Sequence, residues 1–142
     1  MTDEKLKQEQ ADEEMINQAF QHLLESYLTS KHRRKVEIIT KAFNFAKQAH
    51  KGVKRRSGEP YIMHPIAVAQ IACSEIGLGS TSICAALLHD VVEDTDYTVE
   101  DIENLFGPKV AQIVDGLTKI SGGIFGDRAS AQAENFKKLL LT

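Results

Sequence analysis

Hydrophobic side chains recur at intervals of three and four residues in several separate segments of this chain. The first such segment contains Ile16, Ala19, Phe20, Leu23, Leu24, Tyr27 and Leu28. This spacing predicts a helix with one apolar face. Residues 1–11 are polar, and we expect them to be frayed and disordered. A second helix is expected from a cap at Ser30 to about His50.

The middle of the chain predicts a loop followed by two helices. Residues 51–64 contain two glycines and one proline and show no helical period, so we expect a loop there. Pro65 is well placed as the first residue of a helix that ends near Gly77. The next helix is expected to begin at Ser80 or Thr81.

The last third of the chain is also predicted to be helical. Thr98 and Asp101 have the spacing of a capping box at the start of a short helix. Pro108 is expected to begin the following helix, and residues 121–128, with three glycines, predict a loop before a final helix from about Ala129. No segment shows convincing alternation of period two, so the predicted fold class is all-α.

Composition narrows the class of protein. A chain of 142 residues with 42% hydrophobic and 26% charged residues fits one soluble globular domain. Its net charge of −3 argues against a general nucleic-acid binder. There is no apolar run long enough to span a membrane and no signal-peptide pattern, so we expect a cytoplasmic protein without membrane binding. Cys73 and Cys84 lie among apolar residues and are expected to be buried, reduced thiols.

The predicted helix after Ser80 carries a cluster of polar groups. His89, Asp90, Glu93 and Asp94 fall within six positions, and at about 100° per residue they share one side of the helix. The surrounding sequence is too apolar for a solvated surface helix, and buried carboxylates need a partner. A divalent cation would provide one. Imidazole with carboxylate suits manganese, iron or zinc better than calcium.

His64 ends the predicted loop directly before a helix. A single histidine in such a place is more often structural than a ligand. Together with His89 and Asp90, however, His64 gives the H…HD ligand pattern of the HD phosphohydrolase superfamily.

The predicted loop is also basic. It contains Lys51, Lys54, Arg55 and Arg56 within six residues. Such clusters are usually solvated surface, but this one leads into His64 and so could flank the metal site. Arginine binds phosphate oxygens in pairs and stacks on bases, which favours a nucleotide diphosphate as ligand. A metal centre beside these cations suits phosphoester hydrolysis.

Three segments together resemble a known family. They are R-R-S-G-E-P-Y-I-M-H-P at 55–65, L-L-H-D-V-V-E-D-T at 87–95 and D-G-L-T-K-I at 115–120. From about residue 35 onward the chain resembles the N-terminal hydrolase domain of RelA/SpoT-type alarmone enzymes. The resemblance implies an HD-domain helical bundle. It also implies manganese-dependent removal of the 3′-pyrophosphate of ppGpp and pppGpp, which yields GDP or GTP and pyrophosphate in the stringent response.

The resemblance also implies roles for individual residues near the metal. His64, His89 and Asp90 match three of the family's four manganese ligands. Glu93 and Asp94 match an acidic pair that orients or activates the attacking water.

A second set of residues matches the family's nucleotide contacts. Arg55, Arg56 and Ser57 match the loop that holds the guanine and ribose side of the nucleotide. Position 56 is often lysine in relatives, which keeps the charge. Lys119 is a weaker match to a phosphate contact.

One family motif is not found in these residues. The fourth metal ligand of the family, an aspartate in a D-x-R-V…L-A-D-R-L-H-N segment, is expected about twenty residues beyond Thr142, and long members continue into a synthetase domain. We therefore expect residues 1–142 to be the N-terminal portion of the hydrolase domain, with weak metal binding and little activity alone. Two alternatives stay open: a non-catalytic regulatory module of a longer (p)ppGpp synthetase, and an HD hydrolase of another nucleotide.

Overall fold

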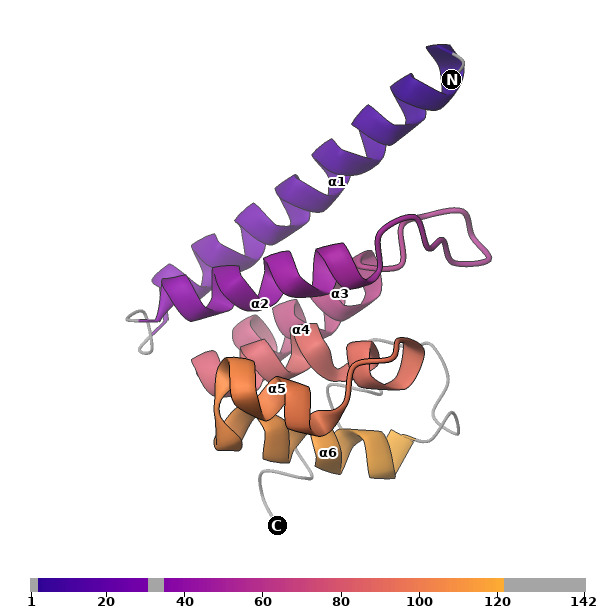
Figure 1. The fold of residues 1–142 in the computed structure, drawn as a ribbon. Helices are drawn as coiled ribbons and strands as arrows, with labels where there is room; N and C mark the ends of the chain where they lie inside the picture. Colours follow the sequence, from indigo (N-terminus) through magenta and orange to yellow (C-terminus); the bar gives the residue numbers. More distant parts are fainter. Residues whose placement is uncertain (1–2, 31–34, 122–142) are drawn as a thin grey trace.

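A computed structural model describes residues 3–30 and 35–121, with side chains up to Thr118 (Figure 1). Its helical elements are α1 (Asp3–Leu28), α2 (Val36–Ala49), α3 (Met63–Ile71), the π-helical turn η1 (Ala72–Ile76), α4 (Ser80–Asp94), α5 (Val99–Phe106) and α6 (Pro108–Ser121). Among these residues there is no strand, only one isolated antiparallel bridge between Lys54 and Pro60. The predicted all-α class is confirmed.

Helix α4 is the central element of the bundle. It packs against α2, α3 and α6, and every residue from Ser82 to Val91 is buried. A helix that is apolar over nearly its whole circumference is stable only when other helices surround it. The buried part of α4 includes His89 and Asp90, whereas Glu93 and Asp94 lie in its exposed last turn. The four residues were predicted to share one side of the helix, but two of them are buried and two are exposed.

The prediction of a frayed start is wrong for residues 3–11, which continue α1 to its beginning. The first half of α1 projects beyond the other helices (Figure 1). Its residues are exposed, except for the partly buried Asp12, but they are mostly good helix formers. The helix is also tied to the rest of the fold by ion pairs of Asp12 with Lys54 and of Glu13 with Lys47. These partners are remote in sequence, so local polarity gave no sign of them.

The predicted cap of the second helix is also wrong. The Ser30 hydroxyl donates a hydrogen bond to the Tyr27 carbonyl at 2.6 Å and so closes the end of α1. Helix α2 begins later, at Val36, and Lys35 before it makes no side-chain cap. The Lys35 backbone N–H instead donates to the Tyr27 hydroxyl at 3.0 Å.

Helix α3 begins two residues earlier than predicted, at Met63, so His64 and Pro65 both lie in its first turn. It continues through η1 and ends at Gly77, as predicted. Gly77 has a φ of +80°, a conformation that a side chain would strain. The earlier start changes where His64 is held, because His64 belongs to the helix and not to the loop.

The start of α5 is as predicted. Thr98 Oγ1 accepts a hydrogen bond from the Asp101 N–H at 3.2 Å, and the Asp101 carboxylate accepts one from the Thr98 N–H at 3.0 Å. This is a complete capping box. Helix α6 begins at Pro108, also as predicted. The predicted loop after Ser121 and the predicted final helix lie outside the described residues.

The core is built mainly from the helices around α4. Its largest fully buried side chains include Leu23, Tyr27, Ile39, Leu87 and Leu88. Cys73 and Cys84 are buried free thiols, as predicted, and burial raises the pKa of the Cys84 thiol to about 12. None of the described helices combines the length and apolar character needed to cross a membrane.

Candidate metal centre and nucleotide pocket

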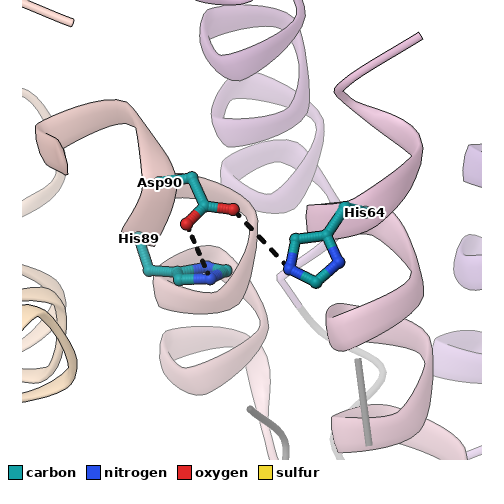
Figure 2. Close-up of side chains that lie close together, drawn as sticks. All are labelled: His64, His89 and Asp90. Carbon is teal, nitrogen blue, oxygen red and sulfur yellow. Dashed lines mark ion pairs between the residues drawn. The ribbon is translucent and has the colours of Figure 1, made fainter. Parts of the chain in front are cut away.

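The fold brings His64 of α3 next to His89 and Asp90 of α4 (Figure 2). One ligand atom from each residue lies within 4.8 Å of the others, and all three side chains are buried. The contact follows from the packing of α3 against α4. Three residues that the sequence pattern grouped are therefore also grouped in space.

The ring of His89 is held in a fixed orientation. Its Nδ1–H donates a hydrogen bond to the Ala86 carbonyl at 2.6 Å, because a carbonyl oxygen is only an acceptor. The other nitrogen, Nε2, lies 3.2 Å from Asp90 Oδ1. A second-nitrogen hydrogen bond of this kind is typical of metal-binding histidines, since it leaves the Nε2 lone pair for the ion.

Asp90 supplies the negative charge of the cluster. His64 Nε2 lies 3.8 Å from Asp90 Oδ2, and Oδ2 is buried with no hydrogen-bond donor among the described residues. A buried carboxylate oxygen without a donor is costly unless a cation compensates it. Two imidazoles and a carboxylate are a suitable donor set for a borderline divalent metal. The residues present thus fit such an ion.

Glu93 and Asp94, the two predicted catalytic acids, lie one turn beyond the cluster on α4 and are exposed. Asp94 borders a pocket of about 740 Å³, which Tyr61 also lines. Its place between the pocket and the buried cluster suits a group that acts on a ligand bound in the pocket.

The three predicted nucleotide contacts, Arg55, Arg56 and Ser57, all line this same pocket. The loop that carries them folds back on itself: the Arg55 N–H donates to the Glu59 carbonyl at 2.9 Å and the Gly58 N–H to the Arg55 carbonyl at 2.8 Å. Gly58 has a φ of +92°, which favours glycine at this turn. The turn therefore presents both arginines on one rim of the pocket.

Lys54 of the basic loop also lines this pocket, and its ammonium group forms an ion pair with Asp12 of α1. Lys119 belongs to α6, but its side chain lies outside the described residues. His64, His89 and Asp90 do not line the pocket themselves. The candidate metal cluster is next to it, because the ring of Tyr61, which lines the pocket, meets the His64 ring edge-on with centroids 6.4 Å apart.

Two pocket residues, His50 and Tyr61, were missed at the level of sequence. His50 is only 4% exposed, and its Nε2 has no hydrogen-bond partner among the described residues. Its ring packs against Tyr61, with ring centroids 4.9 Å apart. Burial lowers the pKa of His50, an effect that nearby Asp90 and Asp94 partly oppose. The only available signal was that the two residues flank the basic loop.

Comparison with known proteins identifies a family and relatives that carry the same kind of domain. The HD domain family matches residues 42–142. A protein of Vibrio cholerae serotype O1 named guanosine-3′,5′-bis(diphosphate) 3′-pyrophosphohydrolase is 47% identical over 117 residues, which cover 82% of this chain and 16% of that protein. The bifunctional (p)ppGpp synthase/hydrolase SpoT of Escherichia coli K12 is 44% identical over 128 residues, 90% of this chain and 17% of that protein.

A solved structure is also similar. It is described as a metazoan ortholog of SpoT that hydrolyzes ppGpp and plays a role in starvation responses. The match has a TM-score of 0.53 and 37% identity, and it covers 56% of this chain and 47% of that one. The chain spans about a sixth of the length of the curated relatives named above.

Proposed function

Because this chain belongs to the HD domain family, we propose that it carries the metal cluster and nucleotide pocket of a (p)ppGpp 3′-pyrophosphohydrolase. The observation that supports this most is the buried cluster of His64, His89 and Asp90 next to a pocket that two arginines line. The names of its relatives point to the same substrate. A nucleotide of this kind is intracellular, so the proposed reaction takes place in the cytoplasm.

The proposed cofactor is Mn²⁺, held by His64, His89 and Asp90. We expect a fourth ligand from residues beyond those described, as in the family that the sequence resembles. When bound, a divalent ion supplies a Lewis acid that offsets phosphate charge and lowers the pKa of water. The buried Asp90 carboxylate and the fixed His89 ring would hold it without rearrangement.

The proposed reaction is hydrolysis at the phosphorus joined to O3′ of the ribose. A water oxygen forms a bond to that phosphorus while the O3′–P bond breaks, and O3′ takes up a proton. The products are GDP or GTP and pyrophosphate. Glu93 and Asp94 would position the water and accept its proton. Both lie in the last turn of α4, just beyond His89 and Asp90, and Asp94 lines the pocket.

The arginines of the loop would bind the substrate rather than act on it. Arg55 and Arg56 offer paired donors to phosphate oxygens and flat surfaces for a base. Together with Ser57 they lie on the same pocket as Asp94. We propose that they balance the charge of the bound nucleotide and hold it close to Glu93 and Asp94.

The test is release of pyrophosphate from ppGpp by the complete gene product that contains these residues, with Mn²⁺ present. His89→Ala and Asp90→Ala are expected to abolish it while circular dichroism shows a folded protein. His22→Ala and Asp96→Ala replace exposed residues of the same types and serve as controls. Variants at 89 and 90 that stay as active as wild type would refute the proposal.

The same assay separates the alternatives. A non-catalytic regulatory module would bind the nucleotide without releasing pyrophosphate. A hydrolase of another nucleotide would release phosphate or pyrophosphate from other members of a substrate panel but not from ppGpp. The presence of His89, Asp90, Glu93 and Asp94 together argues for a catalytic module, since a regulatory one would not need them.

A further inference from the structure

The basic loop has two arms that are joined at their base. Lys54 pairs with Pro60 in the isolated antiparallel bridge, and the Tyr61 N–H donates a hydrogen bond to the Val53 carbonyl at 2.9 Å. Because these contacts link the arms, a force on Lys54 acts on the whole turn. Lys54 also directly precedes the arginines of the nucleotide pocket.

A second pocket, of about 700 Å³, lies between α1 and this loop. Asp12 and Glu13 of α1 line it on one side, and Lys54 and Pro60 of the loop line it on the other. Lys54 lines the nucleotide pocket as well, so the arm that carries it lies between two pockets. Open space on both sides leaves such a segment weakly held unless a specific contact fixes it.

An ion pair supplies such a contact between α1 and the loop. The Lys54 ammonium group donates a hydrogen bond to one carboxylate oxygen of Asp12, and Gln8 Nε2 donates to the other at 2.9 Å. The Asp12 side chain is only 13% exposed, so its pair with Lys54 is less screened than one in open solvent. The hydrogen bond from Lys54 holds the pKa of the Asp12 carboxyl below its usual range, which keeps the carboxylate charged at neutral pH.

The helix that carries Asp12 is itself anchored. One turn further along α1, Ile16 is buried, and the ring of Phe20 stacks on Phe43 of α2 with centroids 3.9 Å apart. Asp12 belongs to the same continuous helix, whose backbone hydrogen bonds fix each turn relative to the next. Asp12 therefore offers the loop an attachment point whose position is set by the core.

We propose that Asp12 is a positioning residue that holds the basic loop, through Lys54, where Arg55 and Arg56 line the nucleotide pocket. The inference rests on the proposed hydrolase function and adds to it a residue of α1, a helix outside both the metal cluster and the nucleotide pocket. The neighbouring ion pair of Glu13 with Lys47 joins α1 to α2 and not to the loop. Asp12 and Glu13 thus differ in the segment that they hold.

The experiment compares Asp12→Asn with wild type in the complete gene product. Asn keeps the size of the side chain and removes its charge, and Glu13→Gln does the same at the adjacent position and is the matched control. By hydrogen exchange with mass spectrometry, we expect the amides of residues 53–61 to exchange about fivefold faster in Asp12→Asn, the upper end of what a partly exposed ion pair contributes. Glu13→Gln should exchange at the wild-type rate in this segment.

Kinetics with ppGpp and Mn²⁺ give the second measurement. In Asp12→Asn the KM should rise about fivefold while kcat stays within about twofold of wild type, because the loop holds the substrate and the metal cluster is unaltered. Asp12→Glu keeps the charge and should restore most of the wild-type KM. Glu13→Gln should leave both constants unchanged.

Three results would overturn the inference and leave the proposed function intact. They are an unchanged loop exchange and KM in Asp12→Asn, equal effects of Asp12→Asn and Glu13→Gln, and a fall in kcat without a rise in KM. A wild-type protein that releases no pyrophosphate would instead refute the proposed function. The exchange rates would then still decide whether Asp12 holds the loop.

Discussion

Replacing Asp90 by Asn is expected to change the response of the protein to manganese far more than its stability without metal. Asn keeps the size of the side chain and removes its charge. In the metal-free protein Asp90 is a carboxylate whose side chain is about 4% exposed, and its Oδ2 accepts no hydrogen bond within the described part of the chain. Removing such a buried charge relieves a desolvation cost of several kcal/mol, which offsets the lost contacts with His64 and His89. We expect Asp90→Asn without metal to lie within about 1 kcal/mol of wild type, or above it.

With metal bound, wild type should be more stable than Asp90→Asn. An ion that binds only the folded state adds RT ln(1 + [L]/Kd), which is about 2.7 kcal/mol at a hundredfold excess over Kd. For a domain of this size each kcal/mol raises the melting temperature by roughly 3 °C, so wild type should gain about 8 °C. Asp90→Asn loses the negative ligand that the described residues supply, and we expect manganese to raise its melting temperature by less than about 2 °C.

The assay is thermal unfolding followed by circular dichroism, in EDTA and in Mn²⁺ at a hundredfold excess over the wild-type Kd from calorimetry. Asp96→Asn, which changes an exposed aspartate just beyond α4, is the matched control and should behave as wild type. Two results would refute the reasoning. One is that manganese raises the melting temperature of Asp90→Asn as much as that of wild type. The other is that Asp90→Asn without metal is several kcal/mol less stable than wild type.

Two further predictions concern stability. Burial lowers the pKa of His50; Asp90 and Asp94 oppose this effect, and His89 adds to it. Folding therefore favours the neutral ring. The contribution of His50 to stability should be full above about pH 6.5 and fall as the pH drops below it. Urea unfolding at pH 7 and pH 5 should show a smaller drop in His50→Gln than in wild type, and equal drops would contradict this origin. Thr98→Ala removes one half of the α5 capping box and should cost about 1 kcal/mol in the same measurement; no loss would mean that the box contributes nothing.

Local sequence patterns were sufficient for most of the fold. Helices α2, α5 and α6 have apolar stripes that depend only on neighbours in the chain, and α5 also has the capping box at Thr98. The start of α1 was not predictable in this way. Its exposed residues are held by Lys47 and Lys54, which reach it only once α2 and the basic loop have folded.

Part of the candidate site was likewise predictable from the sequence, and part was not. The H…HD pattern of the HD phosphohydrolase superfamily grouped His64, His89 and Asp90, and the fold places them together. Spacing could not show that His89 and Asp90 are buried while Glu93 and Asp94 are exposed, because depth depends on where the neighbouring helices end. Nor could it find Tyr61, since an aromatic residue beside a loop becomes informative only when its contacts are known.

The most direct test of the account is the position of manganese in crystals of this chain grown with millimolar Mn²⁺. Data collected at the manganese absorption edge should give an anomalous peak bonded to Nε2 of His64, Nε2 of His89 and the carboxylate of Asp90. A map with no peak among these three side chains, or with peaks only at surface carboxylates, would contradict the central claim that they form one metal site.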